Sequence, residues 1–435
     1  MHGTLFVRRG TMALVVLAAL VFSACGASPP ASQSAADAPT GAPDLAAAPV
    51  DTGGEQMTLQ WWDYYGDLAE TDAALNAAIA KYEAEHPNID IQRTSLGFAD
   101  LKPKIIQAAA TNTMPDIVII DNPDHQAMAD QGALADLTEY IQAWPDKDQY
   151  FTGPWSSTVY QGKNYGVPFE SNATALYYNQ DALTEAGIGA PPATWDELRA
   201  AAQQLTAGDR SGFCFSAKPD EEGTFTFLPF LWQAGGDLPT FGGEASIKAL
   251  SFWNTLVNED GSAPKSVLNM GQGDAYNQFI AGKCAMMING PWQLPNFAND
   301  NPQFAWGVAP WPQDVAAASI LGGENFAAGN GANVATAWEV IRWMAAPQNV
   351  KAPLLSIGLP NRQDMVDDPD WISDPNKKVF VEQVAIARPR AYGANYPQIS
   401  EQVSTAFQRV LTGDATPEAA AQAAAAVIQP LLPVQ

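Results

Sequence analysis

The sequence predicts an α/β protein with two domains. Its 435 residues exceed the size at which a single hydrophobic core usually keeps growing, so two domains are the default expectation. Apolar residues make up 47% of the chain and charged residues 16%, a balance typical of a folded protein. From residue 57 onward, strand-like segments alternate with segments of helical periodicity. This rhythm indicates sheets with helices on both faces.

The amino-terminal part of this alternation contains three expected strands and two expected helices. Apolar residues from Leu75 to Tyr82 recur at the spacing of one helical face, and Pro87 ends that helix. The third strand is a short β-branched segment between turn residues, which is typical of a buried parallel strand. We expect strands at 57–62, 89–96 and 115–121, and helices at 71–87 and 99–113, the second with Pro103 in its first turn.

The carboxy-terminal part continues the same alternation. A strand at 173–179 precedes a helix that opens with a capping box, Thr194 with Glu197, and ends at Gly208. The segment 274–292 reads as a helix, a glycine stop, a strand and a turn that carries Trp292. We expect further helices at 334–347, at 400–413 and after Pro417.

Residues 1–25 have the pattern of an export signal. A short basic segment precedes an apolar segment that is too short for an ordinary membrane span. The segment ends on Cys25 after small residues, as in the lipobox of bacterial lipoproteins, although Phe22 stands where Leu is usual. The alternative is a plain signal peptide with an incidental cysteine. Residues 26–55 are rich in Ala and Pro, which indicates a tether that holds the folded part off the outer face of the cell membrane.

Charge and missing motifs exclude several functions. The net charge of −25 would repel nucleic acid. The sequence contains no nucleophile elbow, phosphate-binding loop, dinucleotide fingerprint or zinc-binding helix motif. After the signal, its histidines are His86, expected to cap a helix, and His125, expected in a solvated loop or at a cleft rim. We therefore expect no metal and no cofactor.

Cys214 and Cys284 lie in strand-like segments, and an exported protein meets an oxidising environment. They can form a disulfide between neighbouring strands, or they can be two buried free thiols. We favour the disulfide slightly.

Five segments together resemble extracellular solute-binding protein family 1, the carbohydrate-binding proteins of ABC importers. They are PDIVIIDNPDHQAMADQGALADL, YGVPFESNATALYYNQDALTEAGI, PPATWDELRAAAQQL, FIAGKCAMMINGPW and EQVSTAFQRVLTGDATPEAAAQ. The resemblance implies a type II periplasmic-binding-protein-like fold, in which two lobes with mixed sheets are joined by crossing hinge segments. It places the amino-terminal lobe at 56–168 and 324–366, and the carboxy-terminal lobe at 169–323 and 367–435.

A sugar has flat apolar faces and a rim of hydroxyls, which aromatic rings and hydrogen-bonding side chains recognise. Ligands of open α/β sheets lie at the carboxyl ends of strands. This reasoning and the resemblance favour Tyr64 and Tyr65 over Trp61, which we expect in the core, and leave Trp232 equally suited to cleft or core. The expected ligand-binding residues are Trp62, Asp63, Tyr64, Tyr65, Asp121, Asn122, Glu170, Asn172, Trp232, Trp292, Glu324, Asn325, Arg390 and Tyr392.

The resemblance implies a non-catalytic lipoprotein that captures an uncharged sugar, expected to be a di- or oligosaccharide, and delivers it to permease subunits. We expect a monomer. The alternative is a secreted glycoside hydrolase or lyase with paired carboxylates, which sequence motifs do not exclude. A surface receptor or adhesin with the same fold is a third interpretation.

Overall fold

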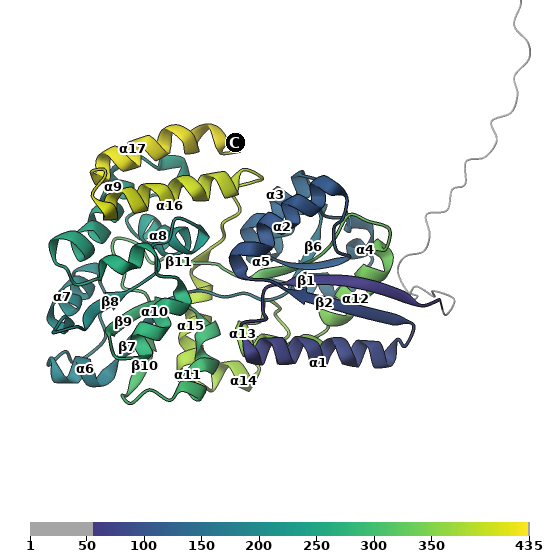
Figure 1. Cartoon of the computed structure of the whole chain (residues 1–435), viewed down its shortest axis with the longest axis horizontal. Coiled ribbons are helices and arrows are strands. Elements are labelled where there is room, and N and C mark those ends of the chain that lie inside the picture. Colours follow the sequence, from purple (N-terminus) through teal and green to yellow (C-terminus); the bar gives the residue numbers. More distant parts are fainter. Residues whose placement is uncertain (1–54, 434–435) are drawn as a thin grey trace, which may run out of the picture. The chain divides into compact units, whose positions relative to one another are not determined.

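The computed structural model describes residues 55–433 of the chain (Figure 1). Nearly all of the expected tether, and the whole expected signal with Cys25, lie outside this described part. The described part contains two main mixed sheets with helices packed on them, so the α/β prediction is confirmed. None of its helices combines the length and the apolar character that a bilayer crossing requires.

The first sheet has the strand order β2-β1-β3-β12-β6. Strands β2, β1 and β3 are parallel, whereas β12 runs antiparallel to both of its neighbours. Residues of β3 alternate between the two faces, so that Ile117 and Ile119 join one hydrophobic cluster while Val118 and Ile120 join another. The strands are β1 (Met57–Asp63), β2 (Ile89–Ser95), β3 (Ile117–Asp121), β6 (Gly166–Pro168) and β12 (Glu324–Ala328).

Helices cover both faces of this sheet, as Figure 1 shows for α1 and α2. Leu75, Ile79 and Tyr82 of α1 pack on one face, as the helical spacing predicts. Leu101 and Ile105 of α2 pack on the other face. The helices are α1 (Ala69–Glu85), α2 (Phe98–Thr111), α3 (His125–Asp130), α4 (Thr138–Gln142), α5 (Thr152–Ser157), α12 (Val334–Met344) and α13 (Pro347–Ile357), with a small hairpin of β4 (Val159–Tyr160) and β5 (Lys163–Asn164).

The second sheet has the order β10-β7-β9-β8 and is antiparallel except for the pair β8–β9. Its largest hydrophobic cluster is rich in aromatic rings, among them Phe213, Phe230, Trp253 and Phe407. The strands are β7 (Ala175–Asn179), β8 (Ser211–Cys214), β9 (Cys284–Asn289) and β10 (Trp306–Ala309), with β11 (Ser319–Ile320) and β13 (Ala387–Arg388) as a separate parallel pair.

The helices of this second part include α7, whose predicted capping box between Thr194 and Glu197 is present. The helices are α6 (Gln180–Glu185), α7 (Trp195–Leu205), α8 (Glu221–Gln233), α9 (Glu244–Asn254), α10 (Gln272–Ile280), α11 (Leu294–Asp300), α14 (Pro369–Ile372), α15 (Pro375–Ala385), α16 (Tyr396–Thr412) and α17 (Pro417–Ile428).

The chain passes between the two sheets in segments that are bonded to one another. Ser171, between β6 and β7, forms a bridge with Leu359, and Asn172 forms one with Gly322. Gly323 has a φ of +126°, and a Cβ there would lie 2.2 Å from the backbone oxygen of Glu170, so only glycine fits this crossing. The crossings agree with the expected order of segments, while the precise lobe limits remain a prediction.

Three local expectations need correction. His125 is fully buried at the start of α3, and burial lowers the pKa of its imidazole to about 3, so it is neither solvated nor at a rim. Helix α2 begins at Phe98, so Pro103 lies beyond its first turn. Strand β1 ends at Asp63, one residue beyond the expected end at Trp62, so Asp63 belongs to the strand and not to the loop after it.

Candidate ligand-binding site

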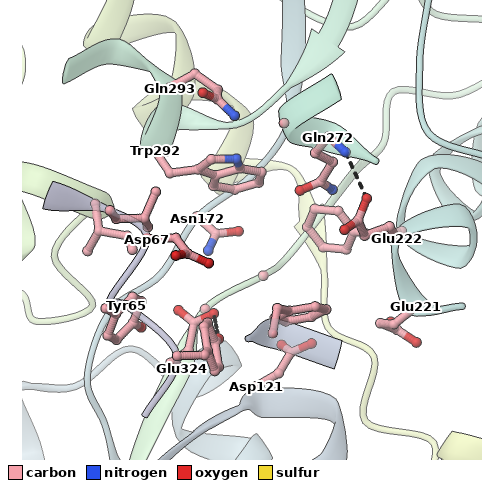
Figure 2. Close-up of a pocket in the computed structure, with 18 of the residues that line it drawn as sticks. Tyr65, Asp67, Asp121, Asn172, Glu221, Glu222, Gln272, Trp292, Gln293 and Glu324 are labelled. Carbon is pink, nitrogen blue, oxygen red and sulfur yellow. Dashed lines mark hydrogen bonds between the residues drawn. The ribbon is translucent and has the colours of Figure 1, made fainter. Parts of the chain in front are cut away.

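A cavity of about 260 Å³ is lined by residues from both parts of the fold and from the crossings (Figure 2). The first sheet contributes the loop after β1 and the end of β3, with Tyr64, Tyr65 and Asp121. The second part contributes the start of α8, the start of α10 and the turn η6 (Pro291–Gln293) after β9. Its volume is close to the lower end of the ~300–1,000 Å³ found for small-molecule sites.

The cavity brings together half of the residues expected from the sequence. These residues come from six separate segments, and every segment lies at the end of a strand, at a crossing or in the loop before α16. They are Tyr64, Tyr65, Asp121, Asn172, Trp292, Glu324 and Arg390.

Aromatic side chains form the apolar part of the wall. Trp292 is half-buried, because η6 holds its ring against both large hydrophobic clusters and leaves part of it open to the cavity. In Figure 2 the indole of Trp292 projects into the same space as Asp67 and Asn172. Phe98 and Phe225 add two more rings. Flat apolar surfaces of this kind can cover the faces of a ring-shaped ligand.

Arg390 forms an ion-pair network at one end of the cavity. Its guanidinium, only 3% exposed, donates to Asp121 at 3.1 Å and to Asn122 at 3.3 Å, and it also pairs with Glu221. Burial alone would lower the pKa of Arg390, but Asp121 and Glu221 raise it above its ordinary value. Burial raises the pKa of Asp121 above its ordinary value, and the positive charge of Arg390 opposes this shift.

Glu324 and Glu170 place two acids side by side at the chain crossings. The Tyr64 hydroxyl donates to Oε1 of Glu324, and the Asn172 amide donates to Oε1 of Glu170 at 2.8 Å. Burial, together with the charge of Glu324, raises the pKa of Glu170 well above its ordinary value. Burial and Glu324 likewise raise the pKa of Tyr64 and of Tyr65. Glu170 therefore keeps its proton in the folded protein under conditions in which an exposed glutamate is ionised.

This shift predicts a pH effect on stability. Above the ordinary pKa of a glutamate, the unfolded chain has lost the Glu170 proton while the folded chain still holds it, so the contribution of Glu170 makes the fold less stable as pH rises. Glu170→Gln keeps the acceptor for Asn172 and removes this titration, so its melting temperature should fall less with rising pH than that of the wild type. The exposed Glu382→Gln should leave the wild-type slope unchanged. Equal slopes for all three proteins would contradict the assignment to Glu170.

Trp62, Asp63 and Glu170 lie outside the cavity lining. Because β1 includes Trp62, strand alternation turns its ring toward the α2 face, where Lys104 lies 4.3 Å from the ring centroid. Asp63 is fully buried and accepts hydrogen bonds from Arg93 at 2.6 and 2.8 Å and from the Trp61 indole at 2.9 Å. Both carboxylate oxygens of Asp63 therefore have partners within the fold, and Asp63 does not line the cavity. Trp61 is in the core, as predicted.

Trp232 and Tyr392 are also absent from the cavity. Trp232 is fully buried in α8, and its indole donates to Asp237 at 3.1 Å. The Tyr392 hydroxyl donates to the same carboxylate. Trp232 is therefore a core residue, the alternative that the sequence left open. Tyr392 packs against that core and does not contact the cavity.

Asn122 and Asn325 support neighbouring residues. Asn122 is 6% exposed and accepts from Arg390, so it helps to orient a cavity residue. Asn325, in the middle of the first sheet, donates to Ser157 at 2.9 Å and is 1% exposed. Strand alternation explains the difference between Asn325 and its neighbour Glu324, which faces the cavity.

The cavity also contains residues that the sequence analysis did not select for the site. The segment after β8 supplies Glu221, Glu222 and Phe225, and the segment after β2 supplies Phe98. These segments follow strand ends, the same signal that identified Tyr64 and Asp121. Applying that signal to every strand would have found them. Gln293 lies in the turn after β9 that also carries Trp292 and so has the same signal, whereas Gln272, at the start of α10, has no such signal.

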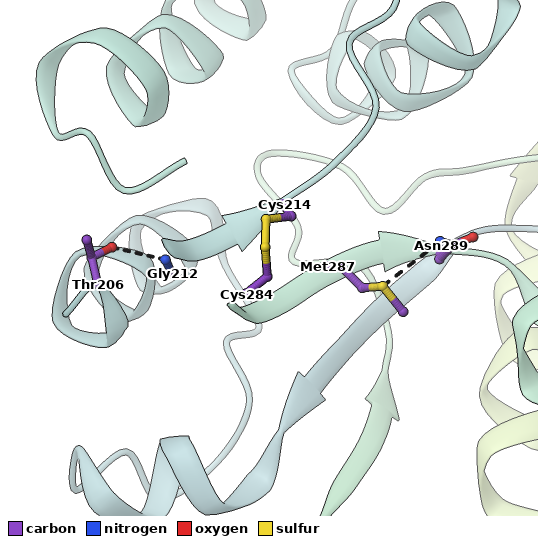
Figure 3. The surroundings of a disulfide bond; sticks show 6 residues. All are labelled: Thr206, Gly212, Cys214, Cys284, Met287 and Asn289. Carbon is purple, nitrogen blue, oxygen red and sulfur yellow. Dashed lines mark hydrogen bonds between the residues drawn. A yellow bond between two sulfur atoms is a disulfide. The ribbon is translucent and has the colours of Figure 1, made fainter. Parts of the chain in front are cut away.

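Cys214 and Cys284 are joined by a disulfide between the neighbouring strands β8 and β9 (Figure 3). Both are buried beside Met270 and Ala275, and neither cysteine lines the cavity.

Comparison with known proteins agrees with this architecture. Residues 65–351 match the family described as bacterial extracellular solute-binding protein. A solute-binding protein of an ABC transporter from Thermotoga lettingae TMO, solved with α-D-tagatose, is 29% identical, with a TM-score of 0.80 over 87% of this chain and 100% of that chain.

Two further proteins extend the comparison. The cyclic α-maltosyl-1,6-maltose binding protein of Arthrobacter globiformis is 27% identical, with a TM-score of 0.72 over 86% of this chain and 99% of that chain. The lactose-binding protein of Rhizobium radiobacter is 26% identical over 62% of this chain and 65% of its own length. The two-lobed fold is thus confirmed, and this chain belongs to the family of bacterial extracellular solute-binding proteins.

Proposed function

We propose that this protein captures a carbohydrate in the cavity described above and delivers it to the membrane permease of an ABC importer. The observation that carries the proposal is the wall itself, where Trp292 faces Asn172, Asp67 and Glu324 across one space (Figure 2). Such a wall offers an apolar face for a sugar ring and polar partners for its hydroxyls. The sugar-binding relatives named above support the same ligand class.

The location of the cavity supports capture by closure. Its lining comes from both parts of the fold, and residues of the segments that join them, Asn172, Gly322 and Gly323, also line it. A ligand that contacts both lobes shifts the protein toward a closed form to the extent that it binds that form more tightly. We infer that the closed form is the one recognised by the permease, and that a lipid on Cys25 keeps the protein at the outer face of the membrane.

Binding without catalysis is part of the proposal. The family is named for solute binding. We therefore expect an oligosaccharide recovered from the protein after prolonged incubation to be intact, and the appearance of new reducing ends would instead favour the hydrolase.

Replacing Trp292 with alanine should weaken sugar binding by about 30-fold or more, as expected for a central aromatic contact. A panel of sugars is first screened by thermal shift, because a specific ligand raises the melting temperature by mass action. Affinity for the best ligand is then measured by calorimetry. Trp62→Ala removes a ring of the same type outside the cavity and should leave affinity unchanged. If Trp292→Ala loses fold stability and spares affinity, the ring is structural and this site is wrong.

A further inference from the structure

The cavity has an excess of negative charge that its own cation does not balance. Among the described residues that line it, Arg390 is the single cation, and it is already paired with Asp121 and Glu221. Oε1 of Glu222 lies 3.8 Å from Nζ of Lys218, so Glu222 is paired with a cation that is not part of the lining. An adjoining cavity adds one cation, Lys102, which is paired with Asp124 at 2.7 Å. The remaining acids of the lining are Asp67 and Glu324, and neither forms an ion pair with any described residue.

Glu324 is the more informative of these two acids because it is buried. The residue is 8% exposed, and its Oε1 accepts from Tyr64. Its Oε2 is buried without a hydrogen-bond partner of good geometry among the described residues, and the neighbouring acid Glu170, which can share a proton with Glu324, brings no positive charge. The side-chain oxygen of Asn172 is also buried without a partner. Figure 2 shows both side chains directed into the cavity beside Asp67. Burying a carboxylate without a cation is costly, so the site is set to receive hydrogen-bond donors that carry positive charge.

The aromatic wall is compatible with a cationic ligand. Phe225 already stacks with the guanidinium of Arg390, whose central carbon lies 4.6 Å from the ring centroid. Trp292, which has the ring type with the strongest attraction for cations, has no such partner among the described residues and lies across the cavity from the acids. A ligand with an ammonium group can meet the indole face and the carboxylates together.

We propose that the cavity prefers a saccharide that carries a protonated amine, with the ammonium group held by Glu324, Asp67 and the oxygen of Asn172. This inference rests on the proposed function and narrows its ligand class from neutral sugars to amine-bearing ones. An ammonium group offers three donors and no acceptor, which suits the buried unpartnered oxygens of Glu324 and Asn172 and the exposed carboxylate of Asp67. A neutral hydroxyl could reach the same oxygens, but it would bring no positive charge to this acidic lining.

The protonation of neighbouring acids gives an independent readout. Burial and the nearby carboxylates raise the pKa of Glu170 and of Asp121, so the empty cavity holds protons where exposed acids would hold none. The positive charge of a bound ammonium group favours the ionised form of these acids, so they would lose protons when the amine binds. Binding of an amine should therefore release protons, and binding of a neutral sugar should release fewer.

The test uses matched sugars that differ in one functional group. Affinities of the full-length protein for glucosamine and glucose, galactosamine and galactose, and chitosan disaccharide and cellobiose are measured by calorimetry at about pH 7. Proton release is obtained from two buffers with different heats of ionisation. The amine of at least one pair should bind about tenfold tighter than its neutral partner or more. N,N′-diacetylchitobiose, which retains the nitrogens without their charge, should lose that advantage.

Two variants locate the preference within the cavity. Glu324→Gln removes a carboxylate and keeps an oxygen that can accept from Tyr64. Asp67→Asn removes the second carboxylate at an exposed position, with little risk to the fold. Each should reduce the amine-to-neutral affinity ratio, whereas the exposed Glu382→Gln, far along the sequence on α15, should not. Equal losses for both members of a pair would show that Glu324 holds sugar hydroxyls only, which would overturn the inference.

The remaining outcomes separate this inference from the proposed function. If neutral sugars bind and no amine binds more tightly than its partner, the amine preference is wrong and sugar capture stands. If no saccharide of either kind binds, the proposed function fails and the inference fails with it.

Discussion

Replacing Arg390 with methionine is expected to lower the free energy of unfolding by about 3–5 kcal/mol, because it leaves two buried or partly buried carboxylates without their cation. The guanidinium joins Asp121 at the end of β3 to Glu221 at the start of α8, so it links elements that pack on different sheets. Methionine fills a similar volume, which keeps the effect on packing small. Urea denaturation followed by tryptophan fluorescence measures the loss.

Arg342→Met is the matched control for this substitution. Arg342 pairs with Glu339 one turn away on α12 and is 44% exposed, so its loss should cost no more than about 0.5 kcal/mol. Adding Asp121→Asn to Arg390→Met removes one uncompensated charge and should recover part of the lost stability. A loss for Arg390→Met as small as that of Arg342→Met, or no recovery in the double variant, would show that the buried network does not stabilise the fold.

The fold was predictable because its elements carry strong periodic patterns. The α1 face from Leu75 to Tyr82, the capping box of α7 and the β-branched strand β3 are local signals, and each element lies close to its expected position. His125 shows the limit of such signals. Its neighbours in the sequence are polar, and only the packing of α3 against the chain near Tyr165 buries it.

The candidate site was predictable only in part, for two physical reasons. Side chains on a strand alternate between its two faces, so Trp62, already inside the expected strand, lies on the α2 face, and Asp63 is buried on the opposite face. Neither side chain lines the cavity. The sequence also does not show which distant segments are in contact, such as the hydrogen bond from Tyr64 to Glu324, 260 positions away. Trp232, for which cleft and core were equally open, is a core residue because α8 is buried on all sides from Gly223 to Gln233.

Removing the disulfide between Cys214 and Cys284 should lower the free energy of unfolding by about 4 kcal/mol, the loop-closure estimate for cysteines 70 positions apart. The bond restricts the unfolded chain, and its loss from the folded protein leaves two small side chains in a buried cluster with Met270 and Ala275. The double variant Cys214→Ala/Cys284→Ala is compared with the wild type by urea denaturation, with and without reductant.

Reductant serves as the internal control for this prediction. It should destabilise the wild type toward the level of the double variant and leave the double variant itself unchanged. Sugar affinity should be unaffected at low denaturant, because neither cysteine lines the cavity. Prompt alkylation of both cysteines in the unfolded, unreduced wild type would show that the thiols are free. In that case the anchoring of β8 to β9 depends on their backbone pairing and on the packing of Phe213 and Met286 alone.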